Sequence, residues 1–331
     1  SMIDGGIVTT NGSNNWQMPV ADPLDLSDID LPVSPYILGY WLGNGDSVGA
    51  VFTIGNHDRV GILENLASEG LALLPTSYGR LRYAPAPLPP ARDIVTGRML
   101  SNGSLTSQLR ELGVLRDKHI PPVYMRAGLQ QRLDLLAGLI DSDGYVSPAG
   151  NIEVTSVKIK LAIGILELVR SLGYKAHLSH ERAMLNGRDV GPKHRITWTC
   201  REGGGRLARK SVDPVSLNRP DVTRIRSVSS IQPIGSVPVC CISVDSPTET
   251  YLATDRFIVT HNSRAGSEWI VEQTQKHPVD ARNIPTEWLV IAETLSDART
   301  ICMEGPAGIL RVLERRSIEH KYKMSPRPMV L

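Results

Sequence analysis

Aromatic residues are scarce in this sequence of 331 residues: they make up 5% of it, and only two are phenylalanine. The hydrophobic content of 41% nevertheless suffices for more than one core. No apolar run approaches the roughly 20 residues that a membrane span needs. The first residues also lack the basic flank and apolar stretch of a signal peptide. We therefore expect a cytoplasmic protein of two or three units.

Cysteine is also rare, and its spacing predicts no disulfide framework. The four cysteines are Cys200, Cys240, Cys241 and Cys302, two of them adjacent. This usage fits a reducing compartment, in which a functional cysteine acts as a nucleophile.

The net charge of +2 conceals a strong asymmetry along the chain. Residues 1–30 carry −5, residues 31–150 carry zero, and residues 151–226 carry +8. The remaining ranges 227–262 and 263–331 carry −2 and +1. A basic middle segment favours a polyanion partner, because Lys and Arg displace counterions from phosphates. A solvated basic surface would show the same pattern, so charge alone leaves both interpretations open.

Helix and strand patterns repeat twice between an acidic Pro-containing linker at 19–32 and a loop at 203–220. In order, we expect helix 35–44, strands 48–54 and 80–83, helix 105–112, helix 133–142, strand 152–155, helix 158–172, and strands 175–180 and 195–199. This order predicts an internal duplication.

The start of each repeat carries a related motif. Residues 136–144 read Leu-Ala-Gly-Leu-Ile-Asp-Ser-Asp-Gly and match LAGLIDADG at eight of nine positions; residues 38–45 read Leu-Gly-Tyr-Trp-Leu-Gly-Asn-Gly. Small residues at Gly39, Gly43, Ala137, Gly138 and Ser142 let two helix backbones approach closely. One acidic group from each helix end would then meet its partner across the seam and hold a hard divalent cation.

On these motifs the chain resembles the LAGLIDADG homing endonucleases. The resemblance implies an α+β, pseudo-symmetric domain of two αββαββα-like repeats that cuts double-stranded DNA as a monomer. It also implies Mg²⁺ (or Mn²⁺) at Asp143, Asn44, Gly45 and Gly144. Asn44 departs from the family, which has an acid there. The lost charge predicts weak cutting, nicking of one strand, or binding without cutting, whether Asn44 is natural or engineered.

The resemblance also implies a catalytic Lys near the scissile phosphates, and Lys118 occupies that position. A surface Lys in a loop is the alternative. Its symmetry mate is left open between Lys193 and Lys210. The family's strands form a saddle along DNA, so the expected DNA-binding residues are Arg80, Arg82, Lys193, Arg195 and Lys210.

A second signal lies at residues 237–263, which resemble the two final blocks of an intein. The resemblance implies a β-rich, Hint-type C-terminal splicing portion. Asn262 would cyclise through its side-chain amide and break the chain before Ser263, with His261 polarising the carbonyl. The Ser263 hydroxyl would accept the upstream acyl group.

The first nucleophile of an intein is not found before the endonuclease region. We expect either a truncation or the C-terminal half of a split intein that has a separate N-terminal fragment as its partner. Cys241 and Thr260 fit an intein class in which a cysteine attacks the upstream junction directly. A buried, inert Cys241 is equally compatible with the sequence.

The residues after Ser263 resemble the phage terminase large subunit just beyond its phosphate-binding loop, which implies a partial α/β segment. The predicted units are therefore residues 1–30 (tail of the N-terminal splicing region and linker), 31–226 (endonuclease), 227–262 (C-terminal splicing segment) and 263–331 (terminase-like flank). Three functions compete: a DNA endonuclease, a splicing component, and a terminase ATPase fragment. The last would lack its phosphate loop.

Overall fold

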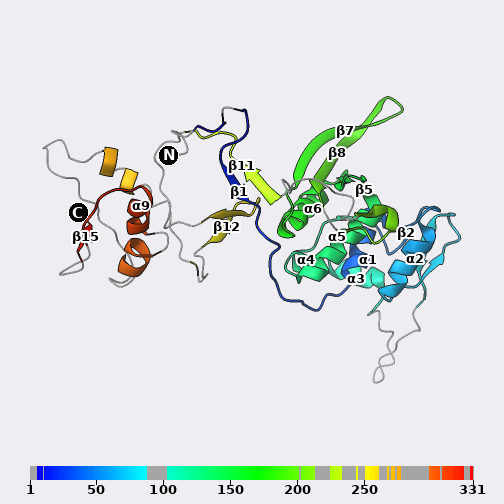
Figure 1. The fold of residues 1–331 in the computed structure, drawn as a ribbon. Helices are drawn as coiled ribbons and strands as arrows, with labels where there is room; N and C mark the ends of the chain where they lie inside the picture. The colour runs from blue at the N-terminus through cyan, green and yellow to red at the C-terminus, as the bar shows by residue number, and fades with distance from the viewer. Residues whose placement is uncertain are drawn as a thin grey trace, which may run out of the picture. The chain divides into compact units, whose positions relative to one another are not determined.

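A computed structural model describes residues 6–9, 11–87, 103–200, 203–212, 224–232, 244, 250–260, 267, 270–272, 274–276, 298–305, 308–323 and 329–330. The chain divides into two compact units (Figure 1). Unit 1 comprises residues 1–231 with 254–257, and unit 2 comprises residues 232–253 with 258–331. Cys240, Cys241, His261, Asn262 and Ser263 lie outside the described residues.

Two helices form the centre of unit 1, as the repeated motif predicted. Helix α1 spans Pro35–Asn44 and α5 spans Leu129–Asp143. Pro35 suits the first turn of α1, where a missing N–H costs nothing. Seven consecutive residues of α1, from Tyr36 to Leu42, are buried, which fits a helix that is apolar on all sides and enclosed by the fold.

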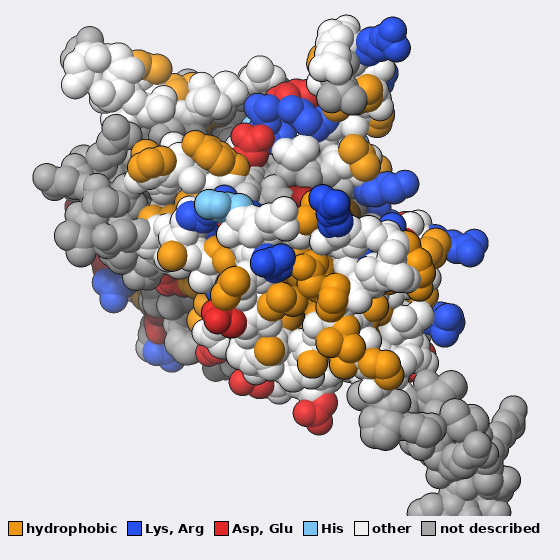
Figure 2. Space-filling model, turned by 90° about the vertical axis from the view of Figure 1, so that its right-hand side faces the viewer, with side chains coloured by type: hydrophobic (Ala, Val, Ile, Leu, Met, Phe, Trp, Pro, Cys, Tyr) orange, Lys and Arg blue, Asp and Glu red, His pale blue; other side chains and the backbone are white. Residues whose placement is uncertain are grey.

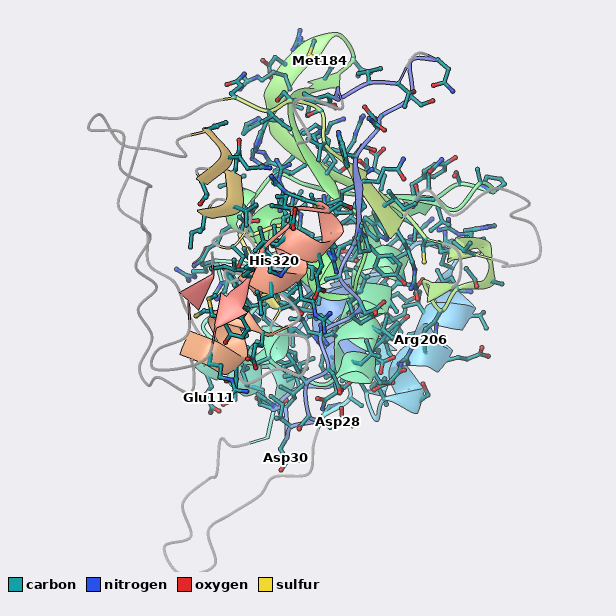
Figure 3. The ribbon with its side chains drawn as sticks, turned by 60° about the vertical axis from the view of Figure 1, so that its left-hand side comes forward. Asp28, Asp30, Glu111, Met184, Arg206 and His320 are labelled. Carbon is teal, nitrogen blue, oxygen red and sulfur yellow. The ribbon has the colours of Figure 1, made fainter. Side chains whose placement is uncertain are left out.

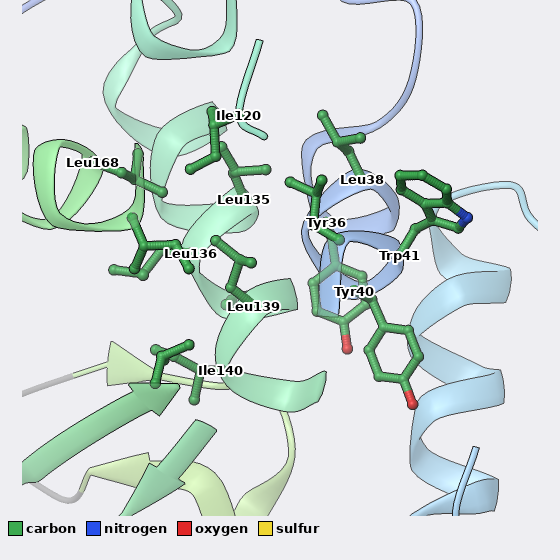
Figure 4. Close-up of a cluster of buried hydrophobic side chains, with 14 of the residues drawn as sticks. Tyr36, Leu38, Tyr40, Trp41, Ile120, Leu135, Leu136, Leu139, Ile140 and Leu168 are labelled. Atoms are coloured by element: carbon green, nitrogen blue, oxygen red, sulfur yellow. The ribbon is translucent and has the colours of Figure 1, made fainter. Parts of the chain in front are cut away.

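Glycines set the distance between α1 and α5. A Cβ on Gly39 would overlap the carbonyl oxygen of Leu135, and a Cβ on Gly138 would overlap that of Tyr36. A Cβ on Gly43 would lie 2.6 Å from the Cβ of Ser142. The two backbones therefore touch along their length, and large side chains such as Trp41 are displaced to the flanks of this glycine seam (Figure 4).

The first repeat adds a small sheet and three helices to α1. Strands β2 (Phe52–Thr53), β3 (Leu73–Pro75) and β4 (Arg82–Pro85) pair in the order β2-β4-β3. The helices are α2 (Arg59–Ser68), α3 (Leu105–Glu111) and α4 (Pro122–Met125). Neither α2 nor β3 was expected from the sequence.

The second repeat is larger and follows the predicted order. Strands β5 (Gly144–Val146), β6 (Asn151–Ser156), β7 (His177–Leu185) and β8 (Arg188–Thr199) form an antiparallel sheet in the order β5-β6-β8-β7. Helix α6 (Ile159–Ser171) packs its apolar face on this sheet. The hairpin β7–β8 is much longer than expected and carries Met184 near its tip (Figure 3).

A short segment closes the second repeat: β9 (Gly203–Gly204), the 3-10 helix η1 (Ala208–Lys210) and β10 (Ser211–Val212). We call residues 203–212 the closing segment. The predicted loop at 203–220 is thus partly wrong, because its first ten residues fold back as a hairpin against α5.

The acidic linker at 19–32 is fixed to the helices of the endonuclease region. The buried guanidinium of Arg132 donates to the Leu24 carbonyl and, at 2.8 Å, to the Ser171 carbonyl. The side chain of Gln131 exchanges two hydrogen bonds with the backbone of Ile29, at 2.7 and 3.1 Å. Before the linker, β1 (Gln17–Pro19) pairs with β11 (Ile225–Ser227).

Unit 2 is described only in pieces. Strands β12 (Tyr251–Ala253) and β13 (Ile258–Thr260) form a hairpin. A π-helical turn at Ala298–Met303, helix α9 (Ile309–Arg315) and strands β14 (Tyr322–Lys323) and β15 (Met329–Val330) complete it. Val271, Met303, Ile309, Val312 and Leu313 form its core. Much of the predicted terminase-like flank, including residues 277–297, lies outside the described residues.

Within the described ranges, every helix is too short or too polar to cross a lipid bilayer.

The glycine seam predicts a large penalty for adding one methyl group. We expect Gly138→Ala to lower the free energy of unfolding by about 2–4 kcal/mol, because overpacking against backbone cannot be relieved by a rotamer change. Gly164→Ala in α6 is the matched control, since its Cβ would lie 3.4 Å from the nearest side-chain atom. Chemical denaturation measures both changes, and equal stabilities of the two variants would contradict the seam.

Candidate functional site

The two central helices end side by side in matching conformations. Gly45 follows α1 with φ −81° and ψ 155°, and Gly144 follows α5 with φ −81° and ψ 148°. Each glycine N–H bonds back to its own helix, Gly45 to the Trp41 carbonyl and Gly144 to the Ile140 carbonyl. No Cβ would fit at either glycine, because each is pressed against that last turn. The duplication inferred from the sequence therefore extends to the backbone at both helix ends.

Asn44 and Asp143 lie next to each other at these ends. The Asn44 amide Nδ2 donates to the Ser142 carbonyl at 3.4 Å. On the other side, a Cβ on Gly43 would lie 3.0 Å from Oδ2 of Asp143. Because the Asn44 amide nitrogen faces a carbonyl oxygen, its own side-chain oxygen is directed elsewhere and remains a possible ligand.

Lys118 closes the end of α1. Its Nζ donates to the carbonyl oxygens of Trp41 at 3.0 Å, Gly43 at 3.2 Å and Gly45 at 2.7 Å. It also lies 5.0 Å from the centroid of the Trp41 ring. A cation is favoured at a helix C-terminus, where carbonyl groups lack intrahelical partners.

Lys210 closes the end of α5 in the same way. Its Nζ donates to the carbonyl oxygens of Ile140 at 2.8 Å, Asp141 at 2.8 Å and Ser142 at 3.4 Å. The pseudo-symmetry that pairs Gly45 with Gly144 also pairs Trp41 with Ile140 and Gly43 with Ser142. Lys210 is thus the structural mate of Lys118.

Lys193, the other candidate, lies on strand β8 of the long hairpin and pairs with Glu181 at 3.1 Å. The structure therefore brings Lys210, and not Lys193, to a helix end.

Burial shifts the proton affinities of these groups. It lowers the pKa of Lys118 to about 8, while the carboxylates of Asp143 and Asp46 oppose the change. Burial also lowers the pKa of Lys210, with Arg209 adding to it and Asp141 opposing it. Crowding by protein raises the pKa of Asp143, and both ammonium groups oppose this rise. Asp143 remains exposed at the surface, so water and solutes reach it.

Asp141 positions Lys210, a role that sequence reasoning missed. Its carboxylate is only 2% exposed and accepts from Tyr36 Oη at 2.8 Å, the Arg206 N–H at 2.9 Å and the Leu207 N–H at 3.2 Å. These bonds tie the closing segment to α5. The signal in the sequence was an acidic residue that directly follows the apolar run Leu135–Ile140 in the last turn of the helix, where a buried carboxylate is rare without a partner.

Arg206 fastens the same segment to three helices. Its guanidinium lies 4.2 Å from the Tyr36 ring centroid on α1 and forms ion pairs of 2.7 Å with Glu69 after α2 and with Asp134 on α5 (Figure 3). The closing segment therefore locks the two repeats together.

Two of the three predicted DNA-contact arginines, Arg82 and Arg195, lie on the sheets and are already paired. Arg82 on β4 pairs with Asp46, which lies beyond the end of α1. Arg195 on β8 pairs with Glu153 at 2.9 Å and with Glu181 at 3.1 Å. Arg80 is exposed in the turn before β4. Figure 2 shows basic side chains spread over one face of the molecule and not gathered into a single patch.

Of the predicted splicing residues, only Thr260 is described. It ends strand β13 and pairs with Tyr251 across the hairpin. Cys241, His261, Asn262 and Ser263 fall outside the described residues, so their geometry is not part of this structure.

The helix ends offer oxygen donors from two side chains, and these carry one charge fewer than a pair of acids would. Among the described residues, no group of three or more His, Cys, Asp or Glu side chains is arranged to hold a metal ion. Asp143 offers a carboxylate and Asn44 a neutral oxygen, both of the hard type that Mg²⁺ accepts. The carbonyl of Gly45 is less available, because it already accepts from Lys118.

Comparisons with known proteins match one segment of the chain to a described family. Residues 119–225 match the model of a family described as homing endonuclease, so the chain carries a homing endonuclease domain. The chain is 30% identical over 265 residues to a replicative DNA helicase DnaB of Mycobacterium intracellulare, covering 80% of this chain and 41% of the relative. It is 28% identical over 194 residues to the homothallic switching endonuclease of Saccharomyces cerevisiae, covering 51% of this chain and 32% of the relative. The chain thus spans less than half the length of either relative.

Two solved structures of the homing endonuclease I-DmoI are also similar. One, of mesophilic variants, shows a TM-score of 0.32 and 13% identity, covering 51% of this chain and 90% of the other. The other, in complex with DNA and Mn, shows a TM-score of 0.31 and 12% identity, covering 51% and 89%.

The pKa of Lys118 near 8 leads to a direct test. We expect Asn44→Asp to raise the pKa of Lys118, because a second carboxylate beside the ammonium favours its charged form. Asp46→Asn should lower that pKa further, since Asp46 opposes the effect of burial. NMR titration of the lysine side-chain carbons measures these shifts. Asp58→Asn is the control, because Asp58 acts on Lys210 and not on Lys118. An unchanged Lys118 titration in all three variants would refute the arrangement.

Proposed function

We propose that this chain is an intein-encoded homing endonuclease that makes metal-dependent cuts in double-stranded DNA at the empty insertion site. It also carries the C-terminal part of a protein-splicing element. The observation that supports the nuclease most strongly is the pair of helix ends. They bring Asn44 and Asp143 together, with half-buried Lys118 on one side and buried Lys210 on the other.

Asp143, Asn44 and the carbonyl of Gly144 would hold Mg²⁺ (or Mn²⁺) at this site. When bound, the cation supplies charge stabilisation for a leaving phosphodiester oxygen and orients water. Lys118 and Lys210 are anchored by helix carbonyls, so their positive charges face the seam without reorganisation. Their positive charge stabilises the negative charge that develops on the phosphate, since the N–H groups of both ammonium groups already donate to carbonyl oxygens.

The charge balance of the site accounts for the expected weak cutting. The two helix ends present one carboxylate, that of Asp143, where a paired-acid site presents two. The deficit lowers the affinity for a divalent cation, while the positive excess still favours phosphate. DNA binding is therefore retained better than cleavage, and nicking of one strand is the intermediate outcome.

The sheets of the two repeats form the DNA-contacting surface in this proposal. Arg82 and Arg195 would exchange their carboxylate partners for phosphates or base edges. Because both repeats lie in one chain, the domain acts as a monomer with internal pseudo-symmetry.

Two observations support the splicing proposal. The match to the helicase relative covers 265 residues, which is longer than the whole range 31–226, so the relationship extends beyond the endonuclease region. The β12–β13 hairpin also ends at Thr260, directly before His261 and Asn262. In this proposal Asn262 cyclises with help from His261, and the Ser263 hydroxyl accepts the upstream acyl group. Cys241 attacks the upstream junction directly, as in the intein class that Cys241 and Thr260 fit. Residues 263–331 would be a flank like the phage terminase large subunit.

The alternative function is trans-splicing. In that case the chain is the C-terminal partner of a separate N-terminal intein fragment, and its endonuclease domain binds DNA without cutting. Asn44 is the observation that favours it, because it removes a charge from the cation site.

Restoring the missing carboxylate should increase cleavage. We expect Asn44→Asp to raise the Mg²⁺-dependent cutting rate at least tenfold on DNA that contains the uninterrupted insertion site, since each 1.4 kcal/mol of charge stabilisation corresponds to about a factor of ten. Asp143→Asn is the matched opposite and should abolish cutting while leaving DNA binding intact. Gel assays of supercoiled, nicked and linear plasmid separate the outcomes. Equal cutting rates for wild type and Asn44→Asp would contradict the proposal that Asn44 weakens cleavage.

Cyclisation at Asn262 should release the C-terminal flank. We expect mass spectrometry of the incubated wild-type chain to show a break after residue 262, and Asn262→Ala to prevent it, because alanine has no side-chain amide to attack the carbonyl. Asn283→Ala is the control asparagine. A fragment that persists in Asn262→Ala would point to proteolysis and contradict cyclisation.

A further inference from the structure

A cavity of about 670 Å³ lies at one end of the β5-β6-β8-β7 sheet in unit 1. One wall consists of side chains from all four strands, including Tyr145, Glu153, His177 and Thr197. Glu153 and Thr197 face each other across β6 and β8, and Thr155 and Arg195 occupy the next such position on the same face. The cavity is therefore continuous with the sheet face proposed to contact DNA.

The opposite wall is basic and is built from three separate parts of unit 1. Arg170 comes from the last turn of α6, Lys175 precedes β7, Arg226 lies on β11, and Arg256 lies in the turn between β12 and β13. None of these four residues belongs to the helix-end site or to the predicted DNA contacts.

Backbone carbonyls hold much of this wall in place. Lys175 donates to the Ile225 carbonyl at 3.2 Å, and Arg226 donates to the Arg256 carbonyl at 3.4 Å. Arg170, only 8% exposed, donates to the Ala176 carbonyl at 3.4 Å and forms an ion pair of 2.7 Å with Asp255.

The cavity has an excess of positive charge. Asp255 neutralises Arg170, and Glu153 is engaged by Arg195. That leaves Lys175, Arg226 and Arg256 without a carboxylate partner among the described ion pairs. The Nε atoms of Arg170 and Arg226 are buried without a hydrogen-bond partner. Mutual repulsion of guanidinium groups lowers the pKa of Arg226, in addition to the larger effect of burial. Gathering cations in this way is unfavourable unless an anion offsets it.

We propose that this cavity binds a backbone phosphate of the DNA, as an anchor separate from the helix-end site. The ligand class follows from the wall, since guanidinium and ammonium groups together recognise phosphate oxygens. Continuity with the sheet face selects a phosphate of the bound duplex over a free ion. The inference rests on the proposed DNA-binding function. The proposed anchor adds β11 and the turn between β12 and β13 to the DNA interface. The turn lies wholly beyond the predicted endonuclease range 31–226, and β11 ends one residue beyond it.

The salt dependence of DNA binding tests the proposal. Lys175 and Arg256 are both exposed, so Lys175→Gln/Arg256→Gln should fold normally, as a thermal unfolding scan would verify. For each phosphate that the double variant no longer neutralises, the slope of log K against log salt should fall by about 0.9. The control Lys276→Gln/Arg311→Gln removes two exposed cations of unit 2 and should leave the slope unchanged. Equal slopes for both double variants and wild type would overturn the proposal.

Two further measurements separate an anchor from a purely structural cluster. Asp255→Asn removes the competing carboxylate and should tighten DNA binding, whereas a structural cluster predicts unchanged or weaker binding. Phosphate ethylation interference should show one or two positions that weaken wild-type binding but have no effect on Lys175→Gln/Arg256→Gln. An identical interference pattern in both proteins would overturn the proposal. If the wild-type chain binds no DNA at all, the proposed function itself fails.

Discussion

The contact of two helix backbones along the glycine seam determines the rest of unit 1. Gly39, Gly43 and Gly138 leave no space for a Cβ, so α1 and α5 approach until their main chains touch. At this distance the Asn44 amide donates to the Ser142 carbonyl at 3.4 Å, next to Asp143.

The seam also brings two helix C-termini together, and a lysine binds the carbonyl groups at each of them. Two adjacent helix C-termini direct unpaired carbonyl groups toward the same region, which is unfavourable without cations. Lys118 and Lys210 supply them, and burial lowers the pKa of each ammonium. A second carboxylate would balance these charges. With Asn44 in place of a carboxylate, the helix-end site carries one negative charge fewer than a paired-acid site.

Much of this arrangement could be predicted from the sequence because it resides in local patterns. The motif at 136–144 placed α5, and its partner at 38–45 placed α1, the seam and the two helix ends. Lys210 could be named only as one of two candidates, because its position depends on Asp141 and Arg206, which act across long sequence separations. The β7–β8 hairpin was underestimated because its outer residues, Arg188–His194, pair through the backbone and lack apolar alternation.

Other parts lay beyond sequence reasoning for similar reasons. The acidic segment at 19–32 has the composition of a loose linker, yet Arg132 and Gln131 hold its backbone through hydrogen bonds that composition does not reveal. The basic cavity draws Arg170, Arg226 and Arg256 from three distant segments, so no local window contains it. The splicing residues around Asn262 were inferred from the order of reactive groups along the chain. A sequence shows that order directly.

The central claim is that α1 and α5 share one cation site. Paramagnetic broadening by Mn²⁺ tests it most directly, with the NMR signals of the Asn44 side-chain amide observed in the DNA-bound protein. The account predicts that Mn²⁺ broadens these signals in the wild-type chain and leaves them sharp in Asp143→Asn, because the ion then loses its one carboxylate. Broadening of Asn44 that persists unchanged in Asp143→Asn would show that the two residues do not share an ion.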